Sequence, residues 1–354
     1  MCAPPPCQAR PRWMGRSRAG RCRQHMQGCR IMDATLSSRI SRRRLLFIGA
    51  AFAGSAVASS WPASVLAAGA LQRWTGQALG AHATIQLAGA PQPLADEAFA
   101  AVTAEIRRLE AIFSLYRADS ELSRLNRKGK LSAPSPELLA VLTLAAAAHR
   151  ETGGLFDPTV QPLFAAYAEH FARADTRSTE LPEKSLDAAL AKVGFEAVRF
   201  DADAVAYARP AMAMTLNGIA QGFITDRVAA LLKGRGFDNV LLDIGEIVAL
   251  GGGRDGRGWR IGLKRAPDQD TVSDRLTLTD RAVATSMPRG TTFDAAGRFG
   301  HIIHPRQGLV TSSVARASVV ADNAARADAL STAAVLMTFE QISQLRARGV
   351  DIRV

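Results

Sequence analysis

Hydrophobic positions recur every three or four residues in several segments of the chain, which is typical of helices with one buried face. These segments are 94–114, 137–151, 181–192, 222–233, 324–337 and 340–348. Glycines follow two of them, at Gly153 and Gly234, where a helix commonly stops. The spacing therefore predicts a chain rich in amphipathic helices.

Shorter apolar runs, some of them alternating with polar residues, predict strands between these helices. They occupy 74–87, 212–216, 239–250, 259–263, 275–278, 282–284 and 317–320. Strands and helices follow one another without regular alternation, which favours an α+β fold over a doubly wound parallel sheet. No internal repeat, low-complexity stretch or Pro/Ser linker follows residue 70. We therefore expect one domain of mixed sheets with flanking helices.

A basic and then apolar leader precedes this domain. Paired arginines follow Ser41, an apolar run of about 14 residues extends from Leu45 to about Ala58, and small residues end the leader at Ala67 or Ala68. The run is shorter than the roughly 20 residues that span a bilayer as a helix, and the order of its parts is that of an export signal. The arginine pair resembles a twin-arginine signal; the alternative is an ordinary secretory signal with a chance pair.

The leader divides the chain into three parts. Met32 would begin a signal peptide of conventional length, so we interpret 1–31 as a disordered start-site extension, 32–68 as a twin-arginine signal peptide and 69–354 as the functional domain. A nucleic-acid-binding arm in 1–31 fits poorly, because it would be removed with the signal. No cysteine follows the apolar run, which excludes a lipoprotein anchor. We expect a soluble periplasmic protein.

The formal net charge of +12 suggests nucleic acid or anionic lipid as a partner, but its distribution argues against both. Residues 1–68 hold 11 arginines against one acid, Asp33, whereas residues 69–354 carry 33 basic and 31 acidic side chains. The cysteines also lie in the first 30 residues, at Cys2, Cys7, Cys22 and Cys29. The domain therefore cannot contain a disulfide, a thiolate metal site or a cysteine nucleophile.

A carboxylate and a hydroxyl four residues apart, at Asp328 and Thr332, would share one face of a helix. Both offer oxygen ligands of the kind that Mg²⁺ prefers. The structural alternative is that Asp328 sits in the first helical turn and that Thr332 bonds back to its own helix. Spacing alone leaves both interpretations open.

Three further segments carry candidate chemistry. The strand–turn–helix junction at 215–222 could offer backbone N–H groups to a phosphate, although it lacks the Gly-Lys-Ser/Thr of a P-loop. His301 and His304, beside Arg306, could form a zinc site, a proton-transfer pair or a phosphate clamp; on an extended segment their side chains would point to opposite faces, which leaves a single general base. Asp157, after Phe156, could contact a flat ligand or begin a turn.

Taken together and in order, these segments resemble the FAD:protein FMN transferase (ApbE-like) family. The resemblance covers about residues 74–338. It rests on seven segments: 79–81, 114–126, 152–159, 216–222, 284–286, 301–308 and 327–332. Members bind FAD with Mg²⁺ and transfer its FMN half to a threonine hydroxyl of a target protein, releasing AMP, and some instead hydrolyse FAD to FMN and AMP.

The resemblance implies a set of site residues. The metal would be held by Asp328, Thr332 and the backbone carbonyl of Gly218, and His301 would accept the hydroxyl proton or steady the phosphate. Flavin and nucleotide contacts would fall on Leu79, Tyr116, Leu155, Phe156, Asp157, Thr215, Gln221 and Ile302, with Ser331 nearby. The expected partners are FAD, the twin-arginine export machinery and a periplasmic or membrane-bound redox protein as acceptor.

The chain departs from the family pattern at several positions. Thr215 and Gln221 stand where the family usually has Asp and Lys, Met287 where it has Gly, and His304 where it has Asp. The segment Asp243-Ile-Gly-Glu246 replaces the usual Asn-x-Gly-Gly. These departures concern FAD affinity and donor choice rather than the fold. They also motivate a third hypothesis, a flavin-binding protein without catalysis.

Overall fold

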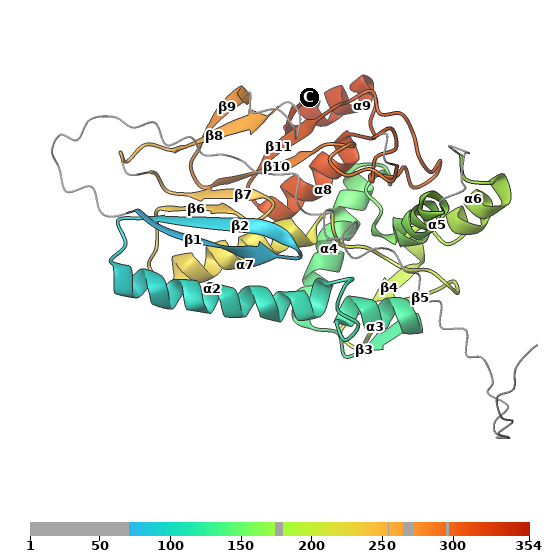
Figure 1. Cartoon of the computed structure of the whole chain (residues 1–354), viewed down its shortest axis with the longest axis horizontal. Helices are drawn as coiled ribbons and strands as arrows, with labels where there is room; N and C mark the ends of the chain where they lie inside the picture. Colours follow the sequence, from blue (N-terminus) through green and yellow to red (C-terminus); the bar gives the residue numbers. More distant parts are fainter. Residues whose placement is uncertain (1–70, 174–179, 254, 265–271, 295–296) are drawn as a thin grey trace, which may run out of the picture. The chain divides into compact units, whose positions relative to one another are not determined.

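The computed structural model describes residues 71–173, 180–253, 255–264, 272–294 and 297–354, which all belong to one compact unit (Figure 1). The expected leader lies outside these residues. A seven-stranded sheet forms the centre, and every neighbouring pair of its strands is antiparallel. In spatial order its strands are β1 (Leu71–Ala78), β2 (Ala81–Ala88), β6 (Val240–Asp243), β7 (Ile247–Leu250), β10 (Arg281–Ser286), β11 (Ala317–Ala321) and β12 (Asp351–Arg353).

Helices cover one face of this sheet and a hairpin covers the other (Figure 1). The helices are α2 (Gln92–Phe113), α7 (Ala220–Gly234) and α8 (Ala324–Ala334), and the hairpin is β8 (Trp259–Lys264) with β9 (Val272–Leu278). Successive strand residues point to opposite faces. Leu242 therefore packs in the helical core, while its neighbour Leu241 packs against Trp259 and the hairpin. Burial on both faces explains why β6 reads as a continuous apolar run.

A second group of elements lies around α4 (Figure 1). They are α3 (Glu121–Lys128), β3 (Lys130–Ser132), α4 (Pro136–Glu151), α5 (Gln161–Ala172), α6 (Glu183–Leu190), β4 (Val198–Phe200) and β5 (Ala204–Tyr207). Helix α9 (Phe339–Ala347) lies apart from them and packs against β12 at the end of the central sheet. A small sheet has the order β3-β5-β4. The periodicity did not predict α3 or α5, but the α+β class and all six predicted helices are confirmed.

Two predicted strands are in fact pairs of strands. The segment 74–87 is a hairpin whose two turn residues, Leu79 and Gly80, have φ of +48° and +84°, the left-handed conformation that a tight two-residue hairpin turn requires. Likewise 239–250 divides into β6 and β7 around a short loop at Gly245, where φ is +88°. Neither turn was predicted, because each lies within a segment that was interpreted as a single strand.

The predicted strand 212–216 is wrong, since this segment has no regular secondary structure and belongs to none of the described strands. The side chain of Asn126 takes the place of a neighbouring strand. Its Nδ2 donates to the carbonyl oxygen of Met214 at 2.8 Å, and the N–H of Met214 donates to its Oδ1 at 2.9 Å. One half-buried amide thus satisfies backbone groups that a sheet would otherwise pair. Among the described residues, no helix has the length and apolarity that crossing a membrane requires.

Candidate functional site

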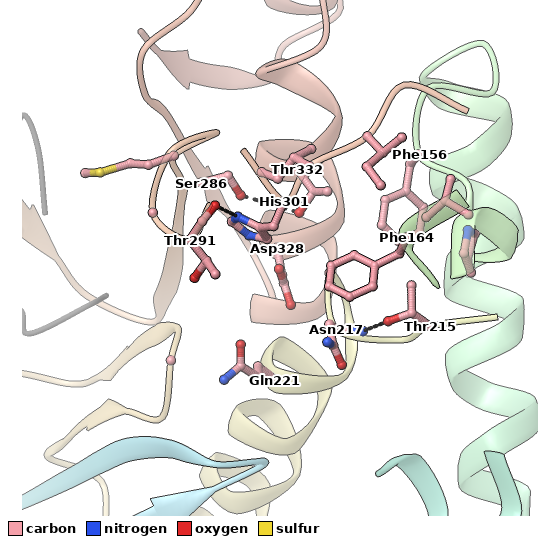
Figure 2. Close-up of a pocket in the computed structure, with 18 of the residues that line it drawn as sticks. Phe156, Phe164, Thr215, Asn217, Gln221, Ser286, Thr291, His301, Asp328 and Thr332 are labelled. Atoms are coloured by element: carbon pink, nitrogen blue, oxygen red, sulfur yellow. Dashed lines mark hydrogen bonds between the residues drawn. The ribbon is translucent and has the colours of Figure 1, made fainter. Parts of the chain in front are cut away.

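A pocket lies where the β1–β2 turn, the start of α7, the β6–β7 loop, the end of β10 and α8 converge (Figure 2). Its apolar walls are Leu79, Tyr116, Leu155, Phe156, Pro158, Val160, Phe164, Met287, Ile302, Ile303 and Leu336. Its polar and glycine lining is Asp157, Thr215, Asn217, Gly218, Gln221, Gly245, Glu246, Thr285, Ser286, Gly290, Thr291, His301, Asp328 and Thr332. Among the described lining residues there is no lysine or arginine.

Close packing of α7 on α8 positions the floor of the pocket. A Cβ on Gly222 would lie 2.4 Å from the carbonyl oxygen of Ala324, so only glycine permits this approach. The N–H of Gly222 donates to Oδ2 of Asp328 at 3.3 Å. The turn before α7 also lies close to α8, because a Cβ on Gly218 would lie 3.1 Å from Oγ1 of Thr332. Two segments more than 100 residues apart in the chain therefore form one surface.

Asp328 does not lie in the first turn of its helix, where the structural alternative placed it. Helix α8 begins at Ala324, its N-cap is Asn323, and Asp328 lies in the second turn rather than the first. Its side chain is buried, lines the pocket and is close to Thr332 one turn later. The hydroxyl of Thr332 lies 3.4 Å from that of Ser286 on β10. Carboxylate and hydroxyl thus share the helix face that meets the pocket.

Buried acids dominate the electrostatics of the site. Burial raises the pKa of Asp328 to about 8, and the neighbouring Asp226 adds to this rise. Burial also raises the pKa of Glu246, which is further raised by Asp328 and Asp243. Because an uncompensated buried charge is unfavourable, such groups coordinate a cation, pair with one, or take up a proton.

The ring of His301 is held by backbone carbonyl groups. Its Nδ1 lies 3.1 Å from the oxygen of Thr291, whose carbonyl also accepts the N–H of His301 at 3.0 Å. Burial lowers the pKa of His301, so the ring is neutral near pH 7, and the carbonyls of Thr291 and Pro288 oppose this shift only in part. A Cβ on Gly300 would lie 1.9 Å from the oxygen of Pro288, which makes glycine necessary beside this histidine.

Twelve of the thirteen predicted site residues line this pocket: Leu79, Tyr116, Leu155, Phe156, Asp157, Thr215, Gly218, Gln221, His301, Ile302, Asp328 and Thr332. Ser331 is the exception. It is fully buried, with its hydroxyl 2.8 Å from that of Ser286 and donating to the carbonyl of Asp328 at 3.0 Å. It therefore supports the wall from behind, because it lies one helical position away from the face that Thr332 presents.

Two of the residues predicted to contact the ligand, Asp157 and Thr215, use their side-chain oxygens to accept hydrogen bonds from nearby residues of the protein. The carboxylate of Asp157 accepts hydrogen bonds from the N–H and hydroxyl of Thr159 and from the N–H of Phe195. The hydroxyl of Thr215 accepts the N–H of Asn217 at 3.2 Å (Figure 2). Both residues border the pocket while their side-chain oxygens are engaged within the protein.

Sequence reasoning did not assign Phe164, Asn217, Ser286 or Thr291 to the site. Phe164 belongs to α5, which the periodicity did not predict, and it lies beside Phe156 in the pocket (Figure 2). Ser286 lies within the segment 284–286, which carried part of the resemblance, so its motif was a usable signal. Asn217 likewise lies within the segment 216–222 of the resemblance, whereas Thr291 had no signal beyond its position near predicted site residues.

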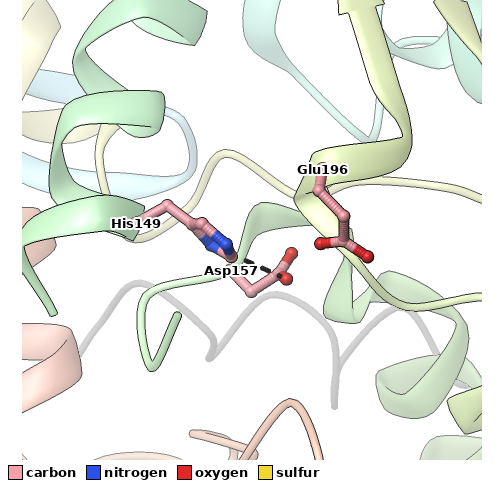
Figure 3. Close-up of side chains that lie close together, drawn as sticks. All are labelled: His149, Asp157 and Glu196. Carbon is pink, nitrogen blue, oxygen red and sulfur yellow. Dashed lines mark ion pairs between the residues drawn. The ribbon is translucent and has the colours of Figure 1, made fainter. Parts of the chain in front are cut away.

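A second cluster lies beside the pocket wall, where ligand atoms of His149, Asp157 and Glu196 all come within 4.8 Å of one another (Figure 3). Its members already have partners. Nδ1 of His149 lies 2.9 Å from the carbonyl oxygen of Phe156 and 3.8 Å from Oδ2 of Asp157. Glu196 is exposed and lies 3.9 Å from Arg209. These contacts favour a structural network that ties α4 to the loop before β4.

Comparison with known proteins agrees with the geometry. The profile of the ApbE family matches residues 79–353. The chain belongs to the ApbE family. A FAD:protein FMN transferase of Vibrio cholerae is 32% identical over 235 residues, which cover 64% of this chain and 70% of that protein.

Solved structures show the same fold. The flavin transferase ApbE of Vibrio cholerae superposes with a TM-score of 0.67 and 27% identity, covering 80% of this chain and 93% of the other. The flavinyl transferase ApbE of Pseudomonas stutzeri, in its apo form, gives a TM-score of 0.69 at 24% identity, with 82% and 93% covered. The expected α+β ApbE-like fold is therefore confirmed.

The departures from the family pattern fall unevenly on this site. Thr215, Gln221, Glu246 and Met287 line the pocket, whereas His304 does not. The ring nitrogen Nδ1 of His304 accepts the N–H of Arg306 at 3.1 Å, so this ring holds a turn of its own backbone. Because position 221 is glutamine in this chain, the pocket that Glu246 and Asp328 line has no lysine at this position.

Proposed function

We propose that this protein is a Mg²⁺-dependent transferase that moves the FMN moiety of FAD to a threonine hydroxyl of a target protein and releases AMP. One observation carries the proposal: oxygen donors at Asp328, Thr332 and Gly218 converge in a pocket with no lysine or arginine among its described lining residues. The pyrophosphate of FAD is anionic, so such a pocket accepts it only together with a cation. Relatives named FAD:protein FMN transferase support FAD as the donor.

The donor set fits Mg²⁺. A carboxylate, a hydroxyl and a backbone carbonyl are hard oxygen ligands, and a magnesium site usually leaves further positions for water and substrate phosphate. Gly218 lies so close to Thr332 that a Cβ would fill the space between them, and the turn that carries the Gly218 carbonyl therefore lies against α8. Bound Mg²⁺ would neutralise charge on the pyrophosphate oxygens during phosphoryl transfer.

The remaining side chains suit the organic parts of FAD. Phe156 and Phe164 lie on the side of the pocket opposite Ser286 and Thr291, and they offer ring faces to a flat ligand (Figure 2). Tyr116 is 53% exposed and borders the same pocket, so its ring can cover a ligand at the edge of the pocket. In the proposed complex these walls would orient the donor, with Asp328 and His301 lining the same pocket as the reacting groups.

In the proposed reaction the threonine oxygen attacks the phosphorus of the FMN half. A new P–O bond to threonine forms as the P–O bond to the AMP phosphate breaks, and AMP leaves with the electron pair of that bond. The hydroxyl proton moves to His301, which is neutral near pH 7 and can therefore accept it. Backbone carbonyls keep the ring in place for this role.

One assay separates the proposed transferase from its alternatives. The protein that starts at residue 69 is incubated with FAD, Mg²⁺ and a threonine-bearing candidate acceptor, and the products are followed by in-gel flavin fluorescence and by AMP release. Covalent flavin on the acceptor with one AMP per flavin supports the transferase. AMP with free FMN indicates a FAD pyrophosphatase, and flavin binding without AMP indicates a non-catalytic binder.

We further propose that residues 32–68 direct twin-arginine export and that the domain from about residue 69 acts in the periplasm on a redox protein. The support is the order of arginine pair, short apolar run and small residues in the leader. N-terminal sequencing of the protein from its native host tests this. A mature start near residue 69 is expected, and an intact Met1 would contradict both the cleavage and the start-site extension proposed for 1–31.

A further inference from the structure

Glu246 occupies a position in the pocket that ordinary fold stability does not explain. It ends the loop between β6 and β7, where the N–H of Ile244 donates to its carbonyl oxygen at 3.0 Å and Gly245 adopts a positive φ. This turn directs the side chain inward, so Glu246 is only 7% exposed and lines the same pocket as Asp328. A carboxylate has been brought to a place where water reaches it poorly.

The surroundings of this carboxylate supply almost no compensation. The backbone N–H of Thr285 is its hydrogen-bond donor, and its charged neighbours are Asp328 and Asp243, which repel it. In the described part of the chain, no salt bridge involves Glu246. Buried acids are normally paired with a cation or bound to a metal ion, and this one lines the same pocket as a second buried acid, Asp328.

Other buried acids nearby have structural roles that Glu246 lacks. Asp226 accepts the N–H groups of Ala324 and Ala325 at 2.7 and 2.9 Å, which fixes the start of α8. Asp243 accepts a backbone N–H from Gly245 and is not part of the pocket lining. Of these four acids only Glu246 and Asp328 line the pocket, so theirs are the two carboxylates that can reach a cation bound there.

We propose that Glu246 supplies a second carboxylate to the divalent-cation site, directly or through one bound water, so that the protein binds the cation before FAD. The inference rests on the proposed function, because it concerns the same site. Affinity for a hard cation rises with the number of charged oxygen ligands. Two carboxylates in a pocket lined by neither lysine nor arginine, in its described part, attract a divalent ion without help from a phosphate.

Mn²⁺ binding to the FAD-free protein tests the inference without using activity. The protein from residue 69 onward is titrated with Mn²⁺, and the free ion is measured by electron paramagnetic resonance. The variants are Glu246→Gln, Glu246→Asp and Asp328→Asn, and Glu183→Gln is the matched control, an exposed acid at the start of α6. Because Glu246→Asp keeps the charge, it reports on the carboxylate even if the glutamine variant folds poorly.

We expect the wild type and Glu183→Gln to bind one Mn²⁺ with equal affinity, Glu246→Gln to bind at least about tenfold more weakly, and Glu246→Asp to lie between them. Asp328→Asn should lose most of the binding. Wild-type affinity in Glu246→Gln, with binding lost in Asp328→Asn, would overturn this inference and leave the proposed function intact. Wild-type affinity in Asp328→Asn would instead remove the cation site on which the proposed function depends. Absence of Mn²⁺ binding by the FAD-free wild type would overturn loading before FAD.

Discussion

The backbone N–H of Gly222 donates to Oδ2 of Asp328, and this contact joins the start of α7 to the second turn of α8. The two residues are 106 positions apart in the chain. The same packing brings Gly218 to Thr332, so one helix contact positions all three oxygen donors of the proposed cation site. Disturbing the contact should therefore affect stability and cation binding together.

Gly222→Ala tests the contact directly. The added Cβ would lie 2.4 Å from the carbonyl oxygen of Ala324, so the helices must separate, at a cost of about 1–3 kcal/mol in the free energy of unfolding. Gly234→Ala is the matched control in the same helix, because nothing lies within 4 Å of its added Cβ. Alanine there should be neutral or stabilise by up to about 1 kcal/mol. Urea denaturation of both variants measures the difference, and equal stabilities would contradict the packing argument.

Removal of the Thr332 hydroxyl should weaken the proposed cation site without unfolding the protein. Thr332→Val keeps the shape of the side chain but loses an oxygen ligand, so we expect the Mg²⁺ concentration for half-maximal activity to rise about tenfold or more. Thr332→Ser keeps the hydroxyl and should behave nearly as the wild type. Steady-state rates measured against Mg²⁺ concentration decide this, and an unchanged Mg²⁺ dependence in the valine variant would discard the ligand role.

Replacement of His301 should slow the chemical step while FAD binding changes little. His301→Ala removes the proposed proton acceptor, and losses of about 10²–10⁴-fold in kcat are typical for such a group. Since burial lowers the pKa of His301, the ring stays neutral at pH 7 and wild-type activity should fall only below about pH 6.5. The acid limb of the rate profile should vanish in the variant. A wild-type kcat at pH 7 would exclude the role.

Asp226 should make stability depend on pH. Burial raises its pKa from 3.8 to about 6, so the folded state holds its proton more tightly than the unfolded chain does. The resulting stabilisation is fully present below about pH 4 and is lost as the pH rises to about 6, by about 3 kcal/mol at most. Unfolding free energies at pH 4 and 6.5 should therefore differ less in Asp226→Asn than in the wild type.

The same substitution tests the contact with α8. An asparagine has one carbonyl oxygen and an amide that cannot accept the N–H of Ala325, so Asp226→Asn should also lower stability at pH 7 by about 1–3 kcal/mol. Asp187→Asn, an exposed acid on α6, is the control for the loss of charge alone. A variant as stable as this control at pH 7 would contradict the helix-capping role.

Gln221→Lys should shift the balance between FAD and cation. The amide of Gln221 packs over Gly245, where an added Cβ would lie 2.8 Å from its Nε2, so a lysine here would lie near Glu246. We expect its charge to raise FAD affinity and to weaken Mn²⁺ binding to the FAD-free protein, each about tenfold. Gln221→Met, similar in length and uncharged, is the control. The prediction is supported if FAD affinity rises while Mn²⁺ affinity falls, and it is contradicted if both affinities change in the same direction.

Much of the site was predictable because its residues lie in short motifs. Asp328 and Thr332 were identified from helical spacing, and the segments around Phe156 and His301 from the order of the family motifs. Ser331, which is buried and does not line the pocket, shows the limit of this reasoning. Neighbouring helical positions point about 100° apart, so a motif of consecutive residues does not say which of them meets the pocket.

By itself, the sequence determined the class of the fold, six of its helices and the chemistry that is available to the site. Periodicity depends on local geometry, so these six helices could be predicted from apolar spacing, whereas α3 and α5 could not, and composition excluded cysteine chemistry from the domain. Turns were hidden where both faces of a strand are buried, as around Gly245, because an apolar run has no period there.

Only the tertiary structure decided which polar groups are free to act. The oxygens of Asp157 and Thr215 are engaged in turns, while Glu246, which the sequence marked only as a departure from a family motif, lines the pocket with Asp328 and has acids as its charged neighbours. Burial and partnership depend on segments distant in the chain, and the packing at Gly222 that sets them has no local signature. Whether a carboxylate serves the fold or a ligand is therefore decided by tertiary contacts.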